Sequence, residues 1–411
     1  MKRFNIALLH YTCPPVVGGV EEIIRQHASL FKRYNHRVKV FAGDGGVFTD
    51  DYDIELNSLL NSCNPRILQI QKNLTKKSCE LESCAEEIFT YLVLALEPFD
   101  VLIAHNVLTM PYNLPLTVAV HGLANNRNIR VVSWNHDSPY FYDPPRLDLK
   151  GEQWNILKDY NPKIYYVTIS EERRSQFQDL YGTKKRIRFI PDGIDPTAFF
   201  NLSPNTINMI REKRLLEAEL LMVQPCRLHP RKNIELSIQV VKALQEKGVH
   251  ARLLLTGAYD PHEKDTTEYY CKLRKLSEQL HIQTDILIAA EHFSVSGKEL
   301  TGDTIVMRDF YLIADVLFIP SLGEGFGIPL LEAGILKLPI VCSDISPFKE
   351  IGKENVQYFS LKDSPEQIAD KILNFISDLK PHQMFRHTMR NYMWDNLYHH
   401  MLLPLLQKVI S

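Results

Sequence analysis

The sequence has no long hydrophobic run. Its apolar stretches are much shorter than the ~20 residues that a membrane-spanning helix needs. Residues 1–12 are basic and then apolar, as in a secretory signal, but the following Cys13-Pro-Pro-Val-Val-Gly-Gly is not a cleavage site. We therefore expect residues 1–12 to contain the first strand of a cytoplasmic protein.

Cysteine pairs, excess charge and repeats are also missing. The seven cysteines include no Cys-x-x-Cys pair, and the nearest two, Cys79 and Cys84, lack a second pair or histidines at metal-ligand spacing. This pattern favours a reducing compartment and predicts no metal site. A formal net charge of −2 gives no support for nucleic-acid binding. The absence of repeats argues against a solenoid.

What the sequence does contain is enough apolar residues for two or three domains. It has 411 residues, of which 45% are hydrophobic and 23% charged, as in ordinary globular proteins. Apolar strands alternate with helical segments, which predicts doubly wound α/β domains. We expect strands at residues 4–11, 37–41, 99–105, 130–134, 163–169, 186–190, 220–225, 252–256, 286–290, 315–320 and 339–342. We expect helices at residues 21–34, 76–96, 233–247, 262–280, 304–313, 364–378 and 384–409.

The most informative stretch follows the strand expected at 315–320. It contains a glycine-bracketed turn, Gly-Glu-Gly-Phe-Gly, and then an apolar helix with a proline near its start. In such a strand–turn–helix unit, backbone amides point outward and the helix dipole favours an anion. Gly325, Phe326 and Gly327 are therefore candidate phosphate-binding residues.

Two carboxylates frame this turn. Glu324 lies within it, and Glu332 lies in the following helix, roughly 12 Å away if most of the spacing between them is helical. This separation suits the two ends of a sugar nucleotide. Hexose hydroxyls would bind at one carboxylate and ribose hydroxyls at the other.

Other candidates stand where expected strands end, because open α/β sheets bind ligands at the carboxyl ends of their strands. Gly18 and Gly19 follow the first strand; they either let backbone approach a diphosphate or form a simple tight turn, the more common role of two glycines. His136 and Gly257 each follow a later strand. The Gly-x-Gly-x-x-Gly fingerprint of dinucleotide-binding domains is absent, so nicotinamide chemistry is not expected.

The stretch Pro-Ser-x-x-Glu-Gly-Phe-Gly, with its Glu-x7-Glu spacing, resembles the signature of the retaining, family-4-type glycosyltransferases. Glu-x7-Glu alone is a weak signal, but it is specific in this setting. The resemblance covers nearly the whole chain and is most specific at residues 225–233 and 315–334. It implies the GT-B fold, in which two doubly wound, Rossmann-like α/β domains face each other across a cleft.

The resemblance also implies domain limits and a reaction. The N-terminal, acceptor-side domain would span residues 1–195, with residues 384–411 crossing back to it, and the nucleotide-sugar-binding domain would span residues 196–383. The enzyme would move a hexose from a nucleoside diphosphate sugar, GDP-mannose or UDP-glucose, to an acceptor hydroxyl. No carboxylate pair of the glycosidase kind is identifiable. The family therefore implies attack on the face from which the diphosphate leaves, with the leaving phosphate accepting the proton of the incoming hydroxyl.

The family's site residues map onto this chain as follows. Glu324 would hold hexose hydroxyls and Glu332 the ribose, and His136 would face the reacting centre. Arg227 and Lys232 would stabilise the leaving diphosphate, so that no metal ion or other cofactor is needed. A solvated basic cluster is the alternative for these two cations. The remaining donor-binding residues would be Gly18, Gly19, Gly257, Gly325, Phe326 and Gly327.

Within the family, several segments are similar to enzymes that make small compatible-solute glycosides, such as mannosylglucosylglycerate synthases. They are His10 to Glu21, Ala104 to Val107 and Trp134 to Asp137. The acceptor class nevertheless stays open between a small molecule, a glycan and a glycolipid, and the oligomeric state is not indicated. Residues 291–303 are longer than the base-binding loop expected after the strand at 286–290, so the base contacts are not predicted.

Several alternatives remain at the level of sequence. Asp51-Tyr52-Asp53 matches the Asp-x-Asp motif of metal-dependent glycosyltransferases of the other major fold, but it follows a polar loop and is expected to be solvated. The segment 384–409 has an apolar face that fits core packing first and weak contact with a membrane surface second. A different GT-B enzyme, such as a nucleotide-sugar epimerase or a phosphorylase, and a non-catalytic sugar-nucleotide-binding subunit also stay open.

Overall fold

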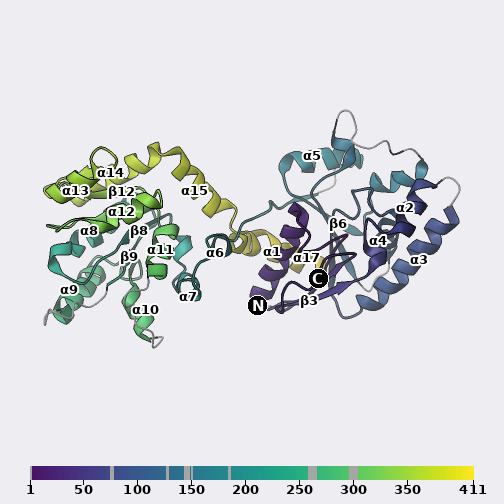
Figure 1. The fold of residues 1–411 in the computed structure, drawn as a ribbon, viewed down its shortest axis with the longest axis horizontal. Coiled ribbons are helices and arrows are strands. Elements are labelled where there is room, and N and C mark those ends of the chain that lie inside the picture. Colours follow the sequence, from purple (N-terminus) through teal and green to yellow (C-terminus); the bar gives the residue numbers. More distant parts are fainter. Residues whose placement is uncertain are drawn as a thin grey trace. The chain divides into compact units, whose positions relative to one another are not determined.

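The structure is a computed structural model that describes residues 2–74, 78–125, 129–142, 149, 151–183, 187–257, 266–295 and 304–411. The chain forms two compact units, shown in Figure 1. The N-terminal unit comprises Met1–Asp195 and Tyr392–Ser411, and the C-terminal unit comprises Pro196–Asn391. The sequence interpretation placed the first boundary at the same residue but began the returning segment at 384; residues 384–391 belong instead to the C-terminal unit.

A parallel sheet forms the centre of the N-terminal unit. Among the described residues it has seven strands in the order β3-β2-β1-β4-β5-β6-β7. The chain adds strands first on one side of β1 and then, from β4 onward, on the other, which makes the sheet doubly wound. The strands are β1 (Asn5–His10), β2 (Arg37–Ala42), β3 (Asp53–Leu56), β4 (Val101–His105), β5 (Arg130–Asn135), β6 (Ile164–Thr168) and β7 (Arg188–Phe189). The sequence analysis predicted no strand at the position of β3, a short edge strand with no buried residue.

Helices cover both faces of this sheet (Figure 1). One face carries α1 together with the C-terminal helices, and the other carries α3 and α4. Continuous apolar runs in the sequence predicted most of these strands correctly, because a parallel strand is buried on both faces. The helices are α1 (Gly19–Arg33), α2 (Pro65–Lys72), α3 (Ser78–Ala95), α4 (Leu114–Asn125), α5 (Glu171–Leu180), α16 (Trp394–Leu397) and α17 (Leu403–Ile410). Short helical turns are η1 (Ser58–Leu60), η2 (Pro139–Phe141), η3 (Glu152–Leu157) and η6 (Tyr398–Leu402).

The C-terminal segment is not the single helix expected at 384–409. Helix α15 (Lys380–Asn391) ends before a parallel bridge between Ile194 and Met393. After this bridge, α16, η6 and α17 continue as one irregular helical run, and η6 has π-helical geometry. Trp394 and Tyr398 are fully buried in the core of the N-terminal unit. The apolar face of this segment therefore packs on protein, as the first of the two interpretations expected.

The C-terminal unit repeats the doubly wound plan. Among the described residues its sheet has six parallel strands in the order β10-β9-β8-β11-β12-β13. Helices α8, α9 and α14 pack on one face, and α7, α11, α12 and α13 on the other. The strands are β8 (Leu220–Gln224), β9 (Ala251–Leu255), β10 (Ile286–Ile288), β11 (Val316–Ile319), β12 (Ile340–Ser343) and β13 (Gln357–Phe359). The helices are α6 (Pro196–Phe199), α7 (Pro204–Lys213), α8 (Ile234–Glu246), α9 (Thr266–Gln279), α10 (Ala289–Val295), α11 (Thr304–Ile313), α12 (Ile328–Ile335), α13 (Ser346–Gly352) and α14 (Pro365–Asp378), with short turns at η4 (Leu215–Glu217) and η5 (Pro230–Lys232).

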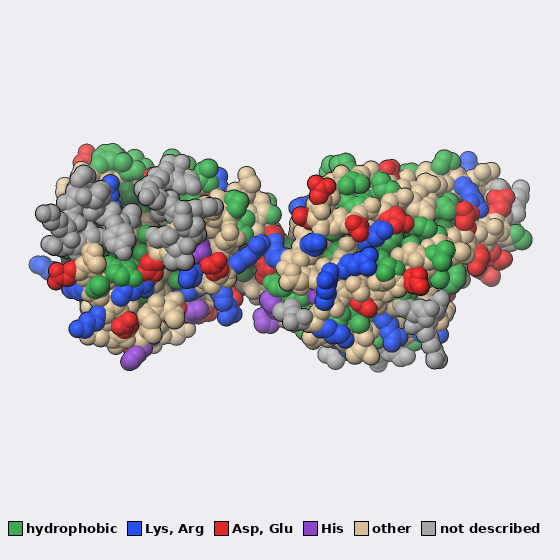
Figure 2. All heavy atoms as spheres, turned by 90° about the horizontal axis from the view of Figure 1, so that it is seen from below, with side chains coloured by type: hydrophobic (Ala, Val, Ile, Leu, Met, Phe, Trp, Pro, Cys, Tyr) green, Lys and Arg blue, Asp and Glu red, His purple; other side chains and the backbone are tan. Residues whose placement is uncertain are grey.

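The surface carries both signs of charge. On the face shown in Figure 2, Lys and Arg side chains are interspersed with Asp and Glu on each unit. None of the helices in the described ranges is both long enough and apolar enough to cross a membrane.

Candidate active site

Two neighbouring strands mark the point where the strand order of the C-terminal sheet reverses. β8 pairs with β11, and the chain adds strands outward from β8 on one side and from β11 on the other. Open parallel sheets bind ligands at such a switch point, beyond the carboxyl ends of the strands. Arg227 and Lys232 follow β8, and Glu324 follows β11. The fold therefore brings these predicted site residues to one edge of the sheet.

Lys232 and Glu324 contact each other directly. The Lys232 ammonium donates a hydrogen bond to Glu324 Oε1. The Ser321 hydroxyl donates to the same oxygen at 2.8 Å, and Arg231 Nη1 lies 3.7 Å from the other oxygen, Oε2. Because the Glu324 side chain is only 13% exposed, these groups replace much of the water that a carboxylate otherwise needs. The sequence analysis named neither Arg231 nor Ser321 as a site residue.

Side-chain hydrogen bonds hold the two loops in place. The Gln224 amide donates to the Lys232 carbonyl at 2.9 Å, and the Asn233 amide donates to the Pro320 carbonyl at 3.1 Å. Asn233 adopts a left-handed conformation with φ of 53°, which asparagine tolerates better than most residues. These contacts fix the backbone on either side of the Lys232–Glu324 pair. A fixed arrangement of charges is what electrostatic catalysis requires.

The glycine turn leads into the N-terminus of α12. Gly327 is the N-cap residue, with φ of 120°, and a Cβ there would lie 3.1 Å from the ring of Phe348. Gly325 faces open space. Within the described part of the chain, the backbone amides of Gly325 and Phe326 donate to no protein acceptor. Exposed amides at a helix N-terminus suit a phosphate group, and the role of these residues in donor binding stays a prediction.

Glu332 is exposed on α12 and has an unexpected partner. The Tyr311 hydroxyl, on α11, donates to Glu332 Oε2 at 2.6 Å. Burial and this hydrogen bond raise the pKa of Tyr311, so its hydroxyl keeps the proton that it donates. Because α12 begins at Ile328, only half of the spacing from Glu324 to Glu332 is helical, and the expected ~12 Å separation does not follow.

The remaining predicted residues of the C-terminal unit differ in their setting. Arg227 is exposed in the loop after β8 and takes part in interactions with the protein. Gly257 has φ of 65°, and a Cβ there would lie 2.2 Å from Ile288 Cγ2, so packing alone requires a glycine. Its role in donor binding stays a prediction. Of the expected base-binding loop, residues 289–295 form α10 and residues 296–303 lie outside the described residues.

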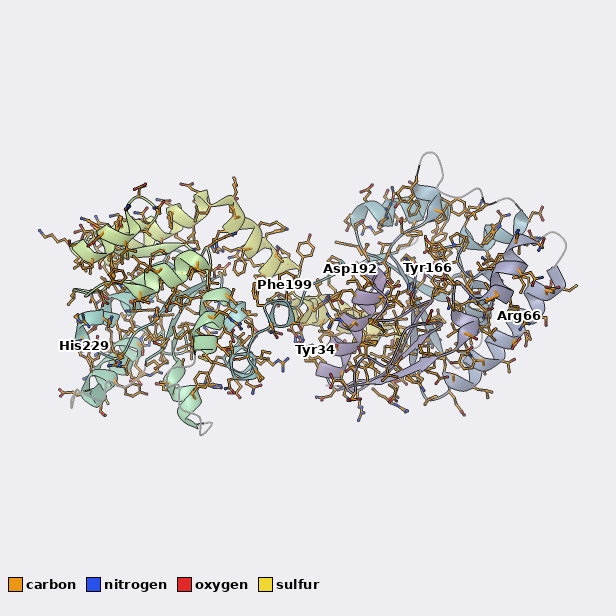
Figure 3. The ribbon with its side chains drawn as sticks, viewed as in Figure 1. Tyr34, Arg66, Tyr166, Asp192, Phe199 and His229 are labelled. Atoms are coloured by element: carbon orange, nitrogen blue, oxygen red, sulfur yellow. The ribbon has the colours of Figure 1, made fainter. Side chains whose placement is uncertain are left out.

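His136 occupies the corresponding edge of the N-terminal unit, at the end of β5. It is 9% exposed, and its two ring nitrogens both have neighbours. Nδ1 lies 3.4 Å from Asp192 Oδ2, and Nε2 lies 3.2 Å from Nδ1 of His105, the last residue of β4. Asp192 is labelled in Figure 3. The sequence singled out His136 but not its two partners.

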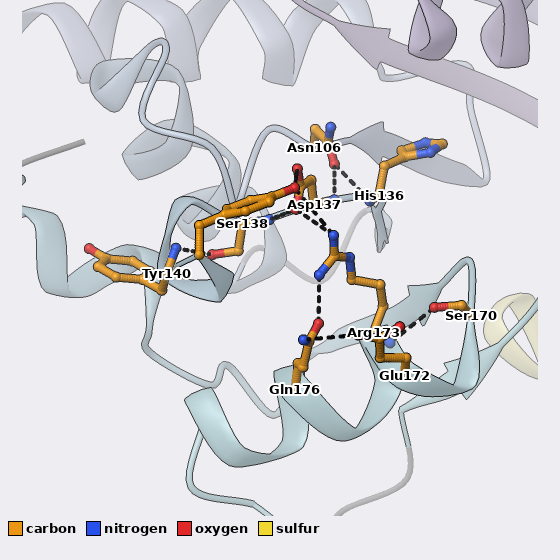
Figure 4. Close-up of polar contacts among 10 residues, drawn as sticks. Asn106, His136, Asp137, Ser138, Tyr140, Ser170, Glu172, Arg173 and Gln176 are labelled. Atoms are coloured by element: carbon orange, nitrogen blue, oxygen red, sulfur yellow. Dashed lines mark hydrogen bonds and ion pairs between the residues drawn. The ribbon is translucent and has the colours of Figure 1, made fainter. Parts of the chain in front are cut away.

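Asn106 and Arg173 build the surroundings of His136 (Figure 4). Asn106 Oδ1 accepts hydrogen bonds from the backbone amides of His136 and Asp137, at 2.7 and 3.3 Å. Arg173, on α5, lies 3.2 Å from the Asp137 carboxylate and stacks over the rings of Phe141 and Tyr142. Two aromatic rings after β5 thus pack on the guanidinium group of Arg173.

Gly18 and Gly19 lie where β1 connects to α1. Gly18 is the N-cap residue of α1 in an extended conformation, with φ of −169°. The three atoms nearest to a Cβ on Gly18 would belong to the Glu21 side chain, with Oε2 at 2.0 Å, and a Cβ on Gly19 would meet nothing within 4 Å. Neither residue has a positive φ, so a tight turn that demands glycine is not the reason for them. Close approach of a ligand to this backbone stays a prediction.

Two cavities of about 650 Å³ lie apart from these residues. One lies in the N-terminal unit and is lined by Arg130, Lys163 and Lys408 among others, and the other lies against α12 in the C-terminal unit. Neither is lined by a predicted site residue. In the described ranges, no three His, Cys, Asp or Glu side chains gather in a way that would hold a metal ion.

Two family models match the chain, one in each unit. The model described as "Glycosyltransferase Family 4" matches residues 17–198, and the model described as "Glycosyl transferases group 1" matches residues 219–378. The second match contains the Lys232–Glu324 pair and the glycine turn.

The chain belongs to the family-4-type glycosyltransferases.

This enzyme, of class EC 2.4, has the two-domain, Rossmann-like GT-B fold that the sequence predicted. It is 23% identical to a mannosylglucosylglycerate synthase of Petrotoga mobilis over 84% of both chains, and 24% identical to one of Thermotoga maritima over 87% of this chain and 85% of the relative. A mannosylfructose-phosphate synthase of Agrobacterium fabrum is 31% identical over 39% of this chain and 33% of its own. The glycosyltransferase assignment sets aside an epimerase and a non-catalytic subunit.

Proposed function

We propose that this glycosyltransferase moves a hexosyl group from a nucleoside diphosphate sugar to an acceptor hydroxyl with retention of the anomeric configuration. The observation that carries the proposal is the Lys232–Glu324 pair at the switch point of the C-terminal sheet, beside the free amides of Gly325 and Phe326. A carboxylate for sugar hydroxyls, a cation and a helix N-terminus for phosphates are the groups that a nucleotide sugar needs.

The diphosphate is the leaving group, so its growing negative charge is what the site has to stabilise. Lys232 and Arg227 supply positive charge there, and the exposed amides of Gly325 and Phe326 supply hydrogen-bond donors. With these groups in place the chemistry has no need of a metal ion. The acceptor hydroxyl would attack on the face from which the diphosphate departs and would pass its proton to the leaving phosphate.

Glu324 would change partners when the donor binds. In this structure its carboxylate accepts from Lys232 and Ser321. On binding, a hexose hydroxyl would donate to Glu324 while the Lys232 ammonium turns to the diphosphate. Glu332 and Tyr311 would then bind the ribose, with the Tyr311 hydroxyl fixing the carboxylate through its 2.6 Å hydrogen bond.

GDP-mannose and UDP-glucose are the donors to test first. The names of the relatives include mannosyl products, which favours mannose. The acceptor would be a small molecule, glycan or glycolipid that presents a free hydroxyl.

The test is a transfer reaction with each donor and a panel of sugars and polyols, with the product examined by proton NMR. We expect an anomeric proton with the configuration of the donor, and the same rate with and without EDTA. A product of inverted configuration would overturn the same-face mechanism, and loss of activity in EDTA that added Mg²⁺ restores would overturn metal independence.

A further inference from the structure

The N-terminal sheet has a switch point of its own, between β1 and β4. The chain adds β2 and β3 beyond β1 on one side, and β5 to β7 beyond β4 on the other. His10 is the last residue of β1, and His105 is the last residue of β4. Glu21 stands in the first turn of α1, which begins directly after Gly18. Open parallel sheets bind ligands where the strand order reverses, so we expect the N-terminal unit to bind a ligand at this edge.

The proton positions on His10 follow from its hydrogen bonds. Its Nδ1 lies 2.7 Å from the backbone carbonyl of His105, which can only accept, so Nδ1 carries a proton. Burial lowers the pKa of His10 to about 4, against the raising effects of the His105 carbonyl and the Glu21 carboxylate. The ring is therefore neutral at pH 7, and its Nε2 is a hydrogen-bond acceptor.

A second acceptor lies beside this nitrogen. Glu21 Oε1 is 3.8 Å from His10 Nε2 and already accepts a 2.5 Å hydrogen bond from the Thr12 hydroxyl. The side chains of His10 and Glu21 are 8% and 13% exposed. Two acceptors so placed, with little access to water, need donors that a ligand supplies.

His136 does not offer such a nitrogen. Its Nδ1 faces Asp192, and its Nε2 faces His105 Nδ1 at 3.2 Å. The titratable residues around His10 are thus His105, His136 and Glu21, and His10 Nε2 lies beside the Glu21 carboxylate.

We propose that His10 and Glu21 bind two adjacent hydroxyl groups of the acceptor, one donating to His10 Nε2 and the other to the Glu21 carboxylate. This inference rests on the proposed function. The two acceptor atoms are 3.8 Å apart, so neighbouring hydroxyl groups that each donate one hydrogen bond of ~2.8 Å can reach both of them at once. An acceptor phosphate or carboxylate would be repelled by Glu21, so the charged end of an acidic acceptor has to point elsewhere. The pair therefore selects the polyol end of the acceptor.

The variants that test this pair each remove one feature. His10→Asn keeps an N–H in place of Nδ1–H for the His105 carbonyl and removes the Nε2 acceptor. Glu21→Gln keeps an oxygen for Thr12 and removes the charge. The control is Glu22→Gln, on the neighbouring residue of α1, whose carboxylate pairs with Arg25 at the surface. Melting temperatures check that all three variants fold.

The assay measures transfer and, without acceptor, hydrolysis of the donor. The probe acceptors are glucose, mannose, glycerol and 2-deoxyglucose, the one 2-deoxy analogue that glucose and mannose share. We expect His10→Asn and Glu21→Gln to lower kcat/KM for the acceptor about 10- to 100-fold, as for one lost hydrogen bond to a charged or buried group. Donor KM and donor hydrolysis stay within about threefold, and Glu22→Gln behaves as wild type.

Other outcomes overturn the proposal in distinguishable ways. If acceptor kcat/KM stays within threefold in both variants, the pair does not bind the acceptor. A rise in donor KM with no change for the acceptor assigns the pair to the donor instead. If the donor is hydrolysed but no hexose is transferred to any probe sugar or polyol, the proposed binding of a diol is wrong, whereas the proposed function is not contradicted. Neither hydrolysis nor transfer with any donor means that the proposed function has failed as well.

Discussion

Replacement of Gly257 by alanine perturbs one residue at the carboxyl end of β9. Gly257 has φ of 65°, in the left-handed region, where a Cβ costs about 1–2 kcal/mol. The added Cβ would lie 2.2 Å from Cγ2 of Ile288, a buried residue of β10, so the backbone or Ile288 has to move. Overpacking of this kind costs about 1–3 kcal/mol.

Strain and overpacking together predict a loss of about 2–5 kcal/mol in the free energy of unfolding of the C-terminal unit. For a domain of this size, each kcal/mol lowers the melting temperature by about 2–4 °C. Gly257→Ala should therefore melt about 4–20 °C below wild type. The matched control is Gly248→Ala in the same unit: its φ is 83°, but a Cβ there meets nothing within 4 Å, so only the strain remains.

The assay is differential scanning calorimetry of the full chain, extended to a double-mutant cycle with Ile288→Ala. In the Ile288→Ala background, the loss in free energy of unfolding caused by Gly257→Ala should be smaller by about 1–3 kcal/mol than in wild type. Equal melting temperatures for Gly257→Ala and Gly248→Ala, with additive effects in the cycle, would refute the packing argument. Gly257 would then be explained by ligand approach alone.

Three further predictions concern other residues. Tyr311→Phe removes the hydrogen bond to exposed Glu332 and should cost less than ~1 kcal/mol of stability while raising donor KM several-fold; unchanged donor KM would remove Tyr311 from the site. Trp394→Ala, which empties a fully buried position, should destabilise the N-terminal unit by about 3–5 kcal/mol in urea unfolding, whereas a loss below ~1 kcal/mol would mean that the returning segment is not part of that core. His36 accepts from the Phe4 amide and has its pKa lowered by burial to about 4, below its unfolded value near 6.5, so its contribution to stability is present above pH 6.5 and is lost as pH falls toward 4. His36→Asn, which keeps an acceptor for Phe4 but does not titrate, should flatten the dependence of stability on pH in this window, and an unchanged slope would contradict the assignment.

The elements of the fold were accessible from the sequence because parallel strands are buried on both faces and so appear as short apolar runs. The strand ending at His10 and the strand before Pro320 are examples. The exceptions have physical reasons. β3 is an exposed edge strand without an apolar run. The interruption of the helix at Met393 coincides with a backbone bridge to Ile194, and hydrophobic periodicity carries no information on such a bridge.

The candidate site was predictable where residues lie within one motif and not where they meet through strand order. Glu324 and Lys232 could be singled out because each lies in a loop after a buried strand and matches a site residue of the family that the sequence resembles. The contact of Ser321 with Glu324 and that of Tyr311 with Glu332 depend on how loops and helices pack. The meeting of His105 with His136 requires β4 beside β5, an order that one sequence does not specify.

A thermal-shift panel of GDP-mannose, UDP-glucose, UDP-N-acetylglucosamine and ADP-glucose would test directly whether Lys232 and Glu324 bind the donor. It uses wild type, Lys232→Ala and Glu324→Ala. A donor at 100 times its dissociation constant should stabilise wild type by roughly 2.7 kcal/mol. We expect one donor to raise the melting temperature of wild type and of neither variant. A donor that stabilises all three proteins equally, or no stabilisation of folded wild type by any donor, would contradict the claim that Lys232 and Glu324 form the donor site.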